Sequence, residues 1–258
     1  MVSSPKSILL ITGMHRSNTS FLAKSFQDAG LNIGDQLIAA DPYNKEGHFE
    51  DEDFVNFHRH LIKKYRLQSR YSMIDYKRCM RLHIDQSDIS RAKQIITERI
   101  KHNEPFGWKD PRSCHFLNLW KRLIPELKCV FIIRDPHDTV NSIVRRHKDR
   151  SKIKLRPDLW YRYHRFWQVC NLQILDHLLK RPQQSLVIHT PEDIIDDRAQ
   201  QRINSTLRDQ WQIKIDPLRL KKNYRPELIT HNDQVSSSKK NTKSLELYEK
   251  IKSLREVN

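Results

Sequence analysis

The segment ILLITGMHRSNTS, from Ile8 to Ser20, joins a short apolar run to a polar loop that begins with glycine. The run Ile8-Leu-Leu-Ile11 shows no alternation, which is typical of a strand buried on both faces of a parallel sheet. Apolar residues at helical spacing follow over residues 19–29. Because backbone N–H groups at such a strand-to-helix turn bind anions, the loop is the first candidate anion site. Its members are Gly13, Met14, His15, Arg16, Ser17, Asn18, Thr19 and Ser20.

This loop is close to the phosphate-binding pattern GxxxxGK[ST] but lacks the lysine of that pattern. Gly13 and Ser20 match. Asn18 stands at the second glycine, and Thr19 replaces the lysine. That lysine normally reaches the β- and γ-phosphates of a nucleoside triphosphate, so its absence disfavours a kinase or an ATPase. Arg16 supplies a cation in the loop instead. An ordinary tight turn is the alternative interpretation of the loop taken alone.

A second candidate anion site follows residues 129–133, the clearest strand of the sequence. Arg134 stands at the carboxyl end of this strand, which is the usual ligand edge of an open α/β sheet. Ser142 lies eight residues later, early in the next predicted helix. A guanidinium and a hydroxyl together suit a phosphate monoester, because the first offers charge and a planar fork and the second a short hydrogen bond.

Short strands alternate with helices along the chain, which predicts a three-layer α/β fold of P-loop type with a central parallel sheet flanked by helices. Strands are expected at residues 8–11, 106–108, 129–133 and 185–189. Helices are expected at residues 19–29, 50–66, 88–102, 116–124, from Pro136 to about 148, at 158–180 and around 245–254. The core is expected to contain Trp108, Trp120, Trp160 and Trp167.

The chain has 258 residues, enough for one domain that buries most of its unfolded surface. Its 47 Lys and Arg against 31 Asp and Glu give a formal charge of +16, so an anionic substrate, cofactor or polymer is expected. Nucleic acid is not an expected partner, because the basic residues are spread along the chain and no zinc-finger, RRM or helix-turn-helix signature is present. The oligomeric state is not predictable from these features.

The cysteine pattern and the apolar runs favour a cytoplasmic protein without a membrane span. The four cysteines are widely spaced and form no CxxC or Cys/His ligand pattern, as expected for a reduced protein that binds no metal. The first apolar run is too short for a signal peptide, and no segment approaches the roughly 18 apolar residues of a membrane span.

With both anion sites in view, the sequence resembles the sulfotransferase family that uses 3′-phosphoadenosine 5′-phosphosulfate (PAPS). GMHRSNTS is similar to the family's 5′-phosphosulfate loop, which is close to GxxRSGTS, and VFIIRDPHDTVNS is similar to its 3′-phosphate segment. The similarity continues in the family's order through segments 44–51, 107–112 and 190–194, and covers most of residues 6–195. The chain resembles the bacterial, glycan-type branch more than the cytosolic small-molecule branch.

Two features depart from the family pattern. Asn18 occupies the position of a glycine, and asparagine tolerates the left-handed backbone conformation better than most residues. The glycine-rich cofactor loop of the cytosolic branch is not visible near the C-terminus. A basic cluster there (Lys221, Lys222 and Arg225) offers cofactor contacts or, as the simpler interpretation, a solvated surface.

The resemblance implies transfer of a sulfuryl group from PAPS to an acceptor hydroxyl or amine, which leaves adenosine 3′,5′-bisphosphate and requires no metal. It implies that the loop from Gly13 to Ser20 holds the 5′-phosphosulfate, and that Arg134 and Ser142 hold the 3′-phosphate. Such a reaction needs in-line positioning, a base for the acceptor proton and a cation near the leaving group. We expect Arg16 to be the cation at the phosphosulfate bridge.

Glu50 is the expected general base, because the resemblance places the catalytic carboxylate of glycan- and protein-modifying relatives after the first helix. Asp51 is the second candidate. The alternative interpretation is that residues 50–53 are the acidic start of a helix, which the helix macrodipole favours. Under either interpretation, the position of residues 50–53 relative to the anion loop decides whether they can act on a bound substrate.

Four further side chains near the predicted sheet edge are candidates. Lys109, which we count among the catalytic residues, and Arg112 follow the short strand at 106–108 and are expected to contact sulfate or acceptor, with Asp110 holding one of them. His15, also a catalytic candidate, is expected to bind the sulfuryl oxygens or to orient the acceptor, although a lone histidine is more often structural.

The acceptor is expected to be a glycan hydroxyl or, close behind, a small metabolite, and an anionic acceptor suits the charge of the chain. Residues 67–90 are expected to cover the acceptor site. Residues 1–230 are predicted to form a single sulfotransferase domain, followed over residues 231–258 by a polar connector and a C-terminal helix. The alternative functions are a P-loop small-molecule kinase and a non-catalytic binder of acidic polymers.

Overall fold

The computed structural model describes residues 8–41, 47–68, 74, 76–100, 105–150, 158–225 and 241–254. Within them, four parallel strands form one sheet in the order β2-β1-β3-β4. The strands are β1 (Ile8–Thr12), β2 (Phe106–Lys109), β3 (Lys128–Arg134) and β4 (Ser185–Thr190). All four were predicted, and each ends one residue later than its apolar run indicated.

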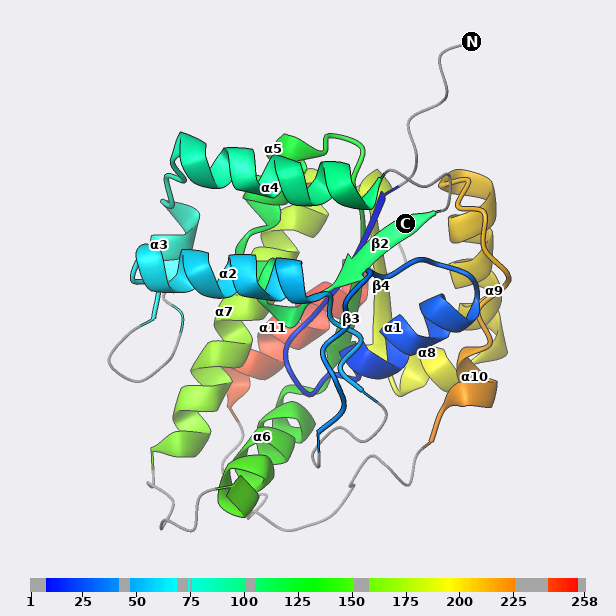
Figure 1. The fold of residues 1–258 in the computed structure, drawn as a ribbon. Coiled ribbons are helices and arrows are strands. Elements are labelled where there is room, and N and C mark those ends of the chain that lie inside the picture. The colour runs from blue at the N-terminus through cyan, green and yellow to red at the C-terminus, as the bar shows by residue number, and fades with distance from the viewer. Residues whose placement is uncertain are drawn as a thin grey trace.

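Alternate residues of β1 point into two separate cores, one on each face of the sheet. Leu9 and Ile11 pack in one apolar cluster, and Ile8 and Leu10 pack in the other. Figure 1 shows the two helical layers that cover these faces. The first layer contains α1 (Thr19–Asp28), α8 (Glu192–Ile195), α9 (Asp197–Ser205), η3 (Thr206–Gln210) and α10 (Leu220–Asn223). The fold is therefore the three-layer α/β arrangement that the sequence predicts.

The second layer holds the longer helices and the tryptophans. It contains α2 (Glu52–Lys64), α4 (Gln86–Arg99), α5 (Leu117–Leu123), α6 (Pro136–Arg150), α7 (Leu159–Lys180) and α11 (Thr242–Ser253). Shorter turns of helix are α3 (Tyr76–Met80), η1 (Pro111–His115) and η2 (Pro182–Gln184). Trp108, Trp120 and Trp167 are fully buried here, whereas Trp160 is partly buried against the same core.

Two helices begin at aspartates that cap them, which corrects their predicted starts. The Asp51 side chain accepts a hydrogen bond from the Asp53 backbone N–H at 3.0 Å, so α2 begins at Glu52 rather than at residue 50. Asp85 caps α4 in the same way, and this helix begins at Gln86, two residues before the predicted start. Glu50 therefore precedes the helix and its cap, and is not part of an acidic first turn.

The C-terminal helix α11 packs on the common core instead of standing apart from it. Leu247, Tyr248 and Ile251 are buried, and Ser244 at the start of α11 bonds to His164 and Gln168 of α7. Most of the predicted polar connector, residues 226–240, lies outside the described residues. The division of the chain at residue 230 stays a prediction. None of the described helices is long and apolar enough to cross a membrane.

The strand order brings the predicted anion sites to one edge of the sheet. β1 lies between β2 and β3, so the strands that follow it in the chain are placed on both of its sides. At such a point, open α/β sheets bind ligands at the carboxyl edge of the strands. The fit is close at Gly13, where a Cβ atom would lie 2.3 Å from the Ile132 carbonyl oxygen of β3. A side chain at this position would push the loop away from β3.

Candidate active site

The loop after β1 adopts two left-handed residues to turn into α1. Arg16 has φ of 69° and Asn18 has φ of 64°. Asparagine accepts this conformation more readily than most residues, and Asn18 adopts it at the position where the family pattern has a glycine. The Asn18 amide also donates a hydrogen bond to the Thr190 hydroxyl oxygen at 2.9 Å. This contact ties the loop to the end of β4, which a glycine could not do.

The same loop contains a buried serine hydroxyl. Ser17 is fully buried, and its Oγ has no hydrogen-bond partner within the described part of the chain. An unsatisfied buried hydroxyl costs about 1–3 kcal/mol. The loop precedes the N-terminus of α1, where backbone N–H groups favour an anion. Ser17 thus fits a phosphate or sulfate oxygen as its missing partner.

The two predicted anion sites are one continuous site. Arg16 Nε donates a hydrogen bond to Ser142 Oγ at 3.0 Å, and Arg134 Nη1 donates one to the Arg16 carbonyl oxygen at 3.3 Å. Arg134 and Ser142 are both buried, and Arg134 also lies 3.5 Å from the Asp138 carboxylate. The structure therefore joins Arg16 of the first loop to the Arg134 and Ser142 pair of the second.

Arg16 lies in a strongly positive environment. Burial, followed by the charges of Arg146 and Arg134, lowers the pKa of the Arg16 guanidinium, and Arg145 acts in the same direction. Asp41 is the nearby charge that opposes them. Several guanidinium groups close together repel one another, and a bound dianion relieves this repulsion. The site around Arg16 is therefore suited to a phosphate monoester.

Lys109 lies between Ser20 of the anion loop and Glu50. Its ammonium nitrogen is 2.7 Å from Glu50 Oε1, 2.9 Å from the His48 carbonyl oxygen and 3.3 Å from Ser20 Oγ. Although its side chain is only 2% exposed, these three oxygens satisfy its donors. An ammonium group from the neighbouring strand β2 thus lies beside the loop, whose own sequence has no lysine.

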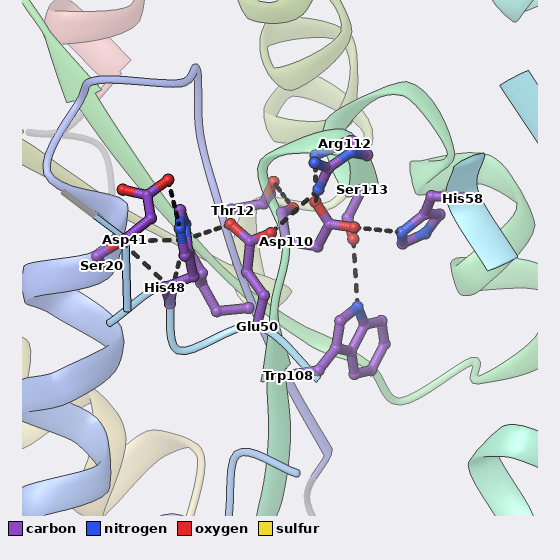
Figure 2. Close-up of polar contacts among 11 residues, drawn as sticks. Thr12, Ser20, Asp41, His48, Glu50, His58, Trp108, Asp110, Arg112 and Ser113 are labelled. Carbon is purple, nitrogen blue, oxygen red and sulfur yellow. Dashed lines mark hydrogen bonds and ion pairs between the residues drawn. The ribbon is translucent and has the colours of Figure 1, made fainter. Parts of the chain in front are cut away.

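Arg112 holds the other oxygen of the Glu50 carboxylate. Its Nη1 is 3.1 Å from Glu50 Oε2 and 2.7 Å from Asp110 Oδ1, so the prediction that Asp110 holds one of these cations is confirmed. Asp110 is fully buried and also lies 2.7 Å from His58 Nδ1, and its backbone carbonyl accepts from Thr12 Oγ1 at 2.8 Å. Figure 2 shows this chain of contacts from Glu50 to His58. Asp110 and its partners fix Arg112 beside Glu50.

Asp51, the second candidate base, is held by partners outside this cluster. Its carboxylate is fully buried and accepts two hydrogen bonds from Arg99, at 2.8 and 3.1 Å. It also caps α2. A carboxylate that is committed to a buried guanidinium and a helix N-terminus is not available to an acceptor. The geometry therefore assigns Asp51 a structural position and leaves Glu50 as the carboxylate at the site.

His15 is a neutral aromatic neighbour of the Glu50 cluster. Burial, and then the positive charge of Arg112, lower the pKa of His15 to about 4. At neutral pH the imidazole is therefore uncharged. The ring is half-buried and stacks on Phe166 of α7, with ring centroids 6.4 Å apart. His15 thus offers a hydrogen-bonding edge beside Glu50 without adding to the charge.

The ionisation of Glu50 is controlled by its two cations. Burial raises the pKa of Glu50, but the charges of Lys109 and Arg112 oppose burial, and the pKa lies below its ordinary value. Because a lowered pKa keeps the carboxylate ionised at neutral pH, loss of the charge is expected only as the pH falls through that lowered value.

Replacing Lys109 by alanine is expected to move the acidic limb of the pH dependence of kcat/KM to higher pH. The reason is that burial of Glu50 would then be opposed by Arg112 alone. Lys109→Arg keeps the charge and is expected to keep the wild-type limb, whatever its effect on the maximal rate. An unchanged limb in Lys109→Ala would mean that Lys109 does not control the ionisation of Glu50.

Sequence reasoning missed the residues that support the segment before Glu50. The His48 carbonyl accepts hydrogen bonds from both Ser20 and Lys109, and the His48 ring lies 3.4 Å from the Asp41 carboxylate. Asp41 in turn lies 3.6 Å from Arg146 of α6. No motif marks these contacts, because they join residues that are far apart in the chain. Gly47 with φ of 102° and Phe49 with φ of 54° are the local signs of a tight turn there.

The described residues contain no cluster of three or more His, Cys, Asp or Glu side chains that could hold a metal ion. Lys221 of the C-terminal basic cluster is exposed and pairs with Asp197 at 3.0 Å. In the same segment, Tyr224 packs edge to face on Phe21 with ring centroids 5.7 Å apart. Tyr224 also lies near enough to Arg134 for that charge to act on its pKa, although burial is the larger cause and raises it.

The fold is that of sulfotransferase domains. The sulfotransferase domain of the olefin synthase from Synechococcus PCC 7002 has 14% sequence identity and a TM-score of 0.54, over 95% of this chain and 94% of that one. The sulfotransferase domain of the curacin biosynthetic pathway has the same identity and TM-score, over 96% and 98% of the two chains. A sulfotransferase from Mycobacterium tuberculosis is 12% identical, with a TM-score of 0.50 over 95% of this chain and 77% of that one.

Comparison of sequences adds nothing to this likeness, since no protein-family model and no curated protein matches the chain. At 12–14% identity the structural likeness concerns the fold. The roles of individual residues therefore rest on the geometry described above.

Proposed function

We propose that this protein is a sulfotransferase that moves a sulfuryl group from PAPS to an acceptor hydroxyl or amine. The observation that carries the proposal is the position of Lys109, which contacts both Ser20 of the anion loop and the Glu50 carboxylate. This arrangement places a cation between a site for an activated anion and a base. The sulfotransferase fold of the chain supports the same reaction class.

The donor nucleotide is proposed to lie along the carboxyl edge of the sheet. Its 5′-phosphosulfate would be held by the loop from Gly13 to Ser20, where Ser17 has a hydroxyl available. Its 3′-phosphate would be held by Arg134 and Ser142, together with Arg16. Three donors with two positive charges match the dianionic phosphate monoester in both charge and hydrogen bonding.

The adenine is proposed to lie against Phe21 and Tyr224. Both rings are half-buried, and Tyr224 is close to Arg134 of the 3′-phosphate site. A flat heteroaromatic base gains stacking energy from such rings, about 1–3 kcal/mol for a nucleobase on an aromatic side chain. Phe21 and Tyr224 would make the cofactor contacts that the glycine-rich loop makes in the cytosolic branch. Lys221 of the basic cluster pairs with Asp197.

Lys109, rather than Arg16, is proposed as the cation at the phosphosulfate bridge. The expectation for Arg16 came from its position in the loop sequence, but its side chain contacts Ser142 on the 3′-phosphate side. The Lys109 ammonium lies beside Ser20 and Glu50. When bound, PAPS supplies an activated sulfuryl group whose leaving group is the 5′-phosphate of adenosine 3′,5′-bisphosphate. Lys109 would stabilise the negative charge that develops on that leaving oxygen.

Glu50 is proposed to remove the proton from the acceptor. The acceptor oxygen or nitrogen forms a bond to sulfur as the bond from sulfur to the leaving oxygen breaks, and Glu50 takes up the acceptor proton. Arg112 and Asp110 hold the carboxylate in place, and neutral His15 can donate a hydrogen bond to a sulfuryl oxygen or orient the acceptor. Lys109 and Arg112 also lower the basicity of Glu50. A weak base suits an acceptor that gives up its proton late in the transfer reaction.

Calorimetric titration of the wild-type protein with adenosine 3′,5′-bisphosphate tests the donor site. We expect micromolar or tighter binding that is unchanged when magnesium is replaced by EDTA. ATP with magnesium is the matched control, and it is expected to bind weakly and to be neither hydrolysed nor used as a phosphoryl donor. Absence of binding by the bisphosphate, or clear phosphoryl transfer from ATP, would overturn the proposal.

A further inference from the structure

His58 of α2 is a fully buried histidine whose two ring nitrogens both have partners. Its Nε2 lies 2.9 Å from the indole Nε1 of Trp120, and its Nδ1 lies 2.7 Å from Asp110 Oδ2. The buried His164 and His177 each leave one ring nitrogen without a partner within the described residues. Burial in this core therefore does not by itself require a fully bonded imidazole, and the two contacts of His58 call for a reason of their own.

The contact with Trp120 decides which nitrogen of His58 carries the proton. An indole N–H can only donate a hydrogen bond, so His58 Nε2 must accept it through its lone pair. The proton therefore lies on Nδ1 and is donated to the Asp110 carboxylate. The ring stacks on Phe116 with centroids 5.1 Å apart, and the neighbouring His115 is uncharged because burial lowers its pKa to about 3. His58 thus gives Asp110 a fixed donor without a positive charge.

Asp110 is held from two sides. Its Oδ1 accepts hydrogen bonds from the backbone N–H and from Nη1 of Arg112, at 2.8 and 2.7 Å, whereas its Oδ2 accepts from His58. Figure 2 shows His58 and Arg112 on either side of this carboxylate. Because Asp110 is fully buried, bulk water would not replace a donor that is lost at Oδ2. His58 therefore fixes the plane of the carboxylate against the pull of Arg112.

One nitrogen of Arg112 serves both carboxylates of the cluster. Nη1 donates to Asp110 Oδ1 at 2.7 Å and to Glu50 Oε2 at 3.1 Å. A carboxylate that loses its donor on one side turns both oxygens toward the remaining guanidinium, since the two-bond pair is a favoured geometry. Such a turn of Asp110 would draw Arg112 away from Glu50. The orientation of Asp110 thus sets how firmly Arg112 holds Glu50.

We propose that His58 is a positioning residue, which acts through Asp110 to keep Arg112 on Glu50 and so holds this carboxylate in place. The inference rests on the proposed function, in which Glu50 is the base, and adds the core residue that controls its surroundings. His58 takes no part in the transfer step itself.

The ionisation of Glu50 reports on the contact with Arg112. Burial is the largest influence on the pKa of Glu50 and raises it, as does the charge of Asp110, whereas Lys109 of β2 and Arg112 of η1 lower it. His15 of the anion loop also interacts with Glu50, and burial lowers the pKa of His15 to about 4, so it is uncharged at neutral pH. Loss of the Arg112 contact removes one of the causes that lower the pKa of Glu50. The pKa of Glu50 is therefore expected to rise when Arg112 is drawn away.

Two substitutions of His58 separate the contact with Asp110 from packing. Asparagine places an amide N–H close to the position of Nδ1, whereas leucine fills the space without a donor. Both variants lack the Nε2 atom that accepts from Trp120, so a difference between them reports on the Asp110 contact. In protein with ¹³C-labelled glutamate, the carboxyl signal of Glu50 is assigned by its absence in Glu50→Gln. Its NMR titration then measures the pKa without any acceptor.

His58→Leu is expected to shift the titration of Glu50 to higher pH, because burial is then opposed mainly by Lys109. His58→Asn is expected to titrate like the wild type. An unchanged titration in folded His58→Leu, or an equal shift in both variants, would overturn the proposal.

A spectrum of the wild-type protein tests the same idea without relying on the folding of a variant. A long-range ¹H–¹⁵N correlation shows which imidazole nitrogen carries a proton, and His58 is recognised by its contact with the indole proton of Trp120. The expected result is a proton on Nδ1 and none on Nε2. A proton on Nε2 would refute the proposal, because the ring could not then accept from Trp120 while donating to Asp110.

Calorimetric titration with adenosine 3′,5′-bisphosphate separates this inference from the proposed function. Both variants of His58 are expected to bind it like the wild type, since the described contacts of His58 do not include Arg134 or Ser142. Binding by the wild type together with an unshifted Glu50 titration in His58→Leu would refute the role of His58 and leave the sulfotransferase proposal intact. Failure of the wild type to bind would instead remove the sulfotransferase proposal, while the titration would still decide whether His58 controls Glu50.

Discussion

Replacing Glu50 by glutamine is expected to lower turnover by about 10²- to 10⁴-fold, while adenosine 3′,5′-bisphosphate still binds with its wild-type affinity. Glutamine has nearly the same shape and can keep one polar contact with Lys109 or Arg112, but it cannot take up the acceptor proton. Since Glu50 does not contact Arg134 or Ser142 in the described contacts, the donor site should not change. Initial rates at saturating PAPS and a calorimetric titration measure the two effects separately.

Glu52→Gln is the matched control for this variant. Glu52 is exposed in the first turn of α2 and lies only two residues from Glu50, so its substitution tests the value of an acidic helix start. Its turnover is expected to stay within about twofold of the wild type. Full turnover in Glu50→Gln, or an equal loss in Glu52→Gln, would contradict the role of Glu50 as the base.

Replacing Arg134 by alanine is expected to weaken the binding of adenosine 3′,5′-bisphosphate by about 30- to 4,000-fold. This range corresponds to the 2–5 kcal/mol typical for truncating one partner of a buried, hydrogen-bonded charge pair. Arg134 is 5% exposed and supports the backbone of Arg16, so its loss removes a charge and also loosens the loop. Calorimetry on folded protein, verified by circular dichroism, measures the change.

Lys221→Ala separates this specific effect from the general positive field. Lys221 is exposed and already paired with Asp197, and its removal lowers the net charge by the same amount as Arg134→Ala. Binding is expected to change by no more than about twofold, since exposed pairs contribute little. Similar losses in both variants would show that the bisphosphate responds to net charge, and the 3′-phosphate site would have to be sought elsewhere.

Much of the fold follows from local pattern. The four apolar runs became the four strands because only a parallel sheet buried on both faces accommodates such uninterrupted sequences. Helix boundaries were less predictable, since the start of α2 depends on whether Asp51 caps the helix or joins it. The side chain of Asp51 caps the helix, and Glu50 therefore lies outside it.

The acceptor specificity of segment 67–90 could not be predicted from its sequence pattern. Its sequence indicated a cover for the acceptor site but no specificity, and residues 69–73 and 75 lie outside the described part. A cavity of about 170 Å³ forms only where Cys79 and Leu82 meet α5 and α7. Neither residue is distinctive in the sequence, because a cavity between elements that are far apart in the chain has no motif.

The sequence alone determined the three-layer α/β fold and predicted the two anion segments, because strands, turns and phosphate loops depend on residues that are close together in the chain. The arrangement at Glu50 depended on tertiary structure. Lys109 reaches Glu50 across 59 positions and Arg16 reaches Ser142 across 126, and these contacts exist because β1 lies between β2 and β3. The position of a long cationic side chain depends on which oxygens surround it after folding, so the exchange of roles that we propose for Arg16 and Lys109 could not be predicted from local pattern.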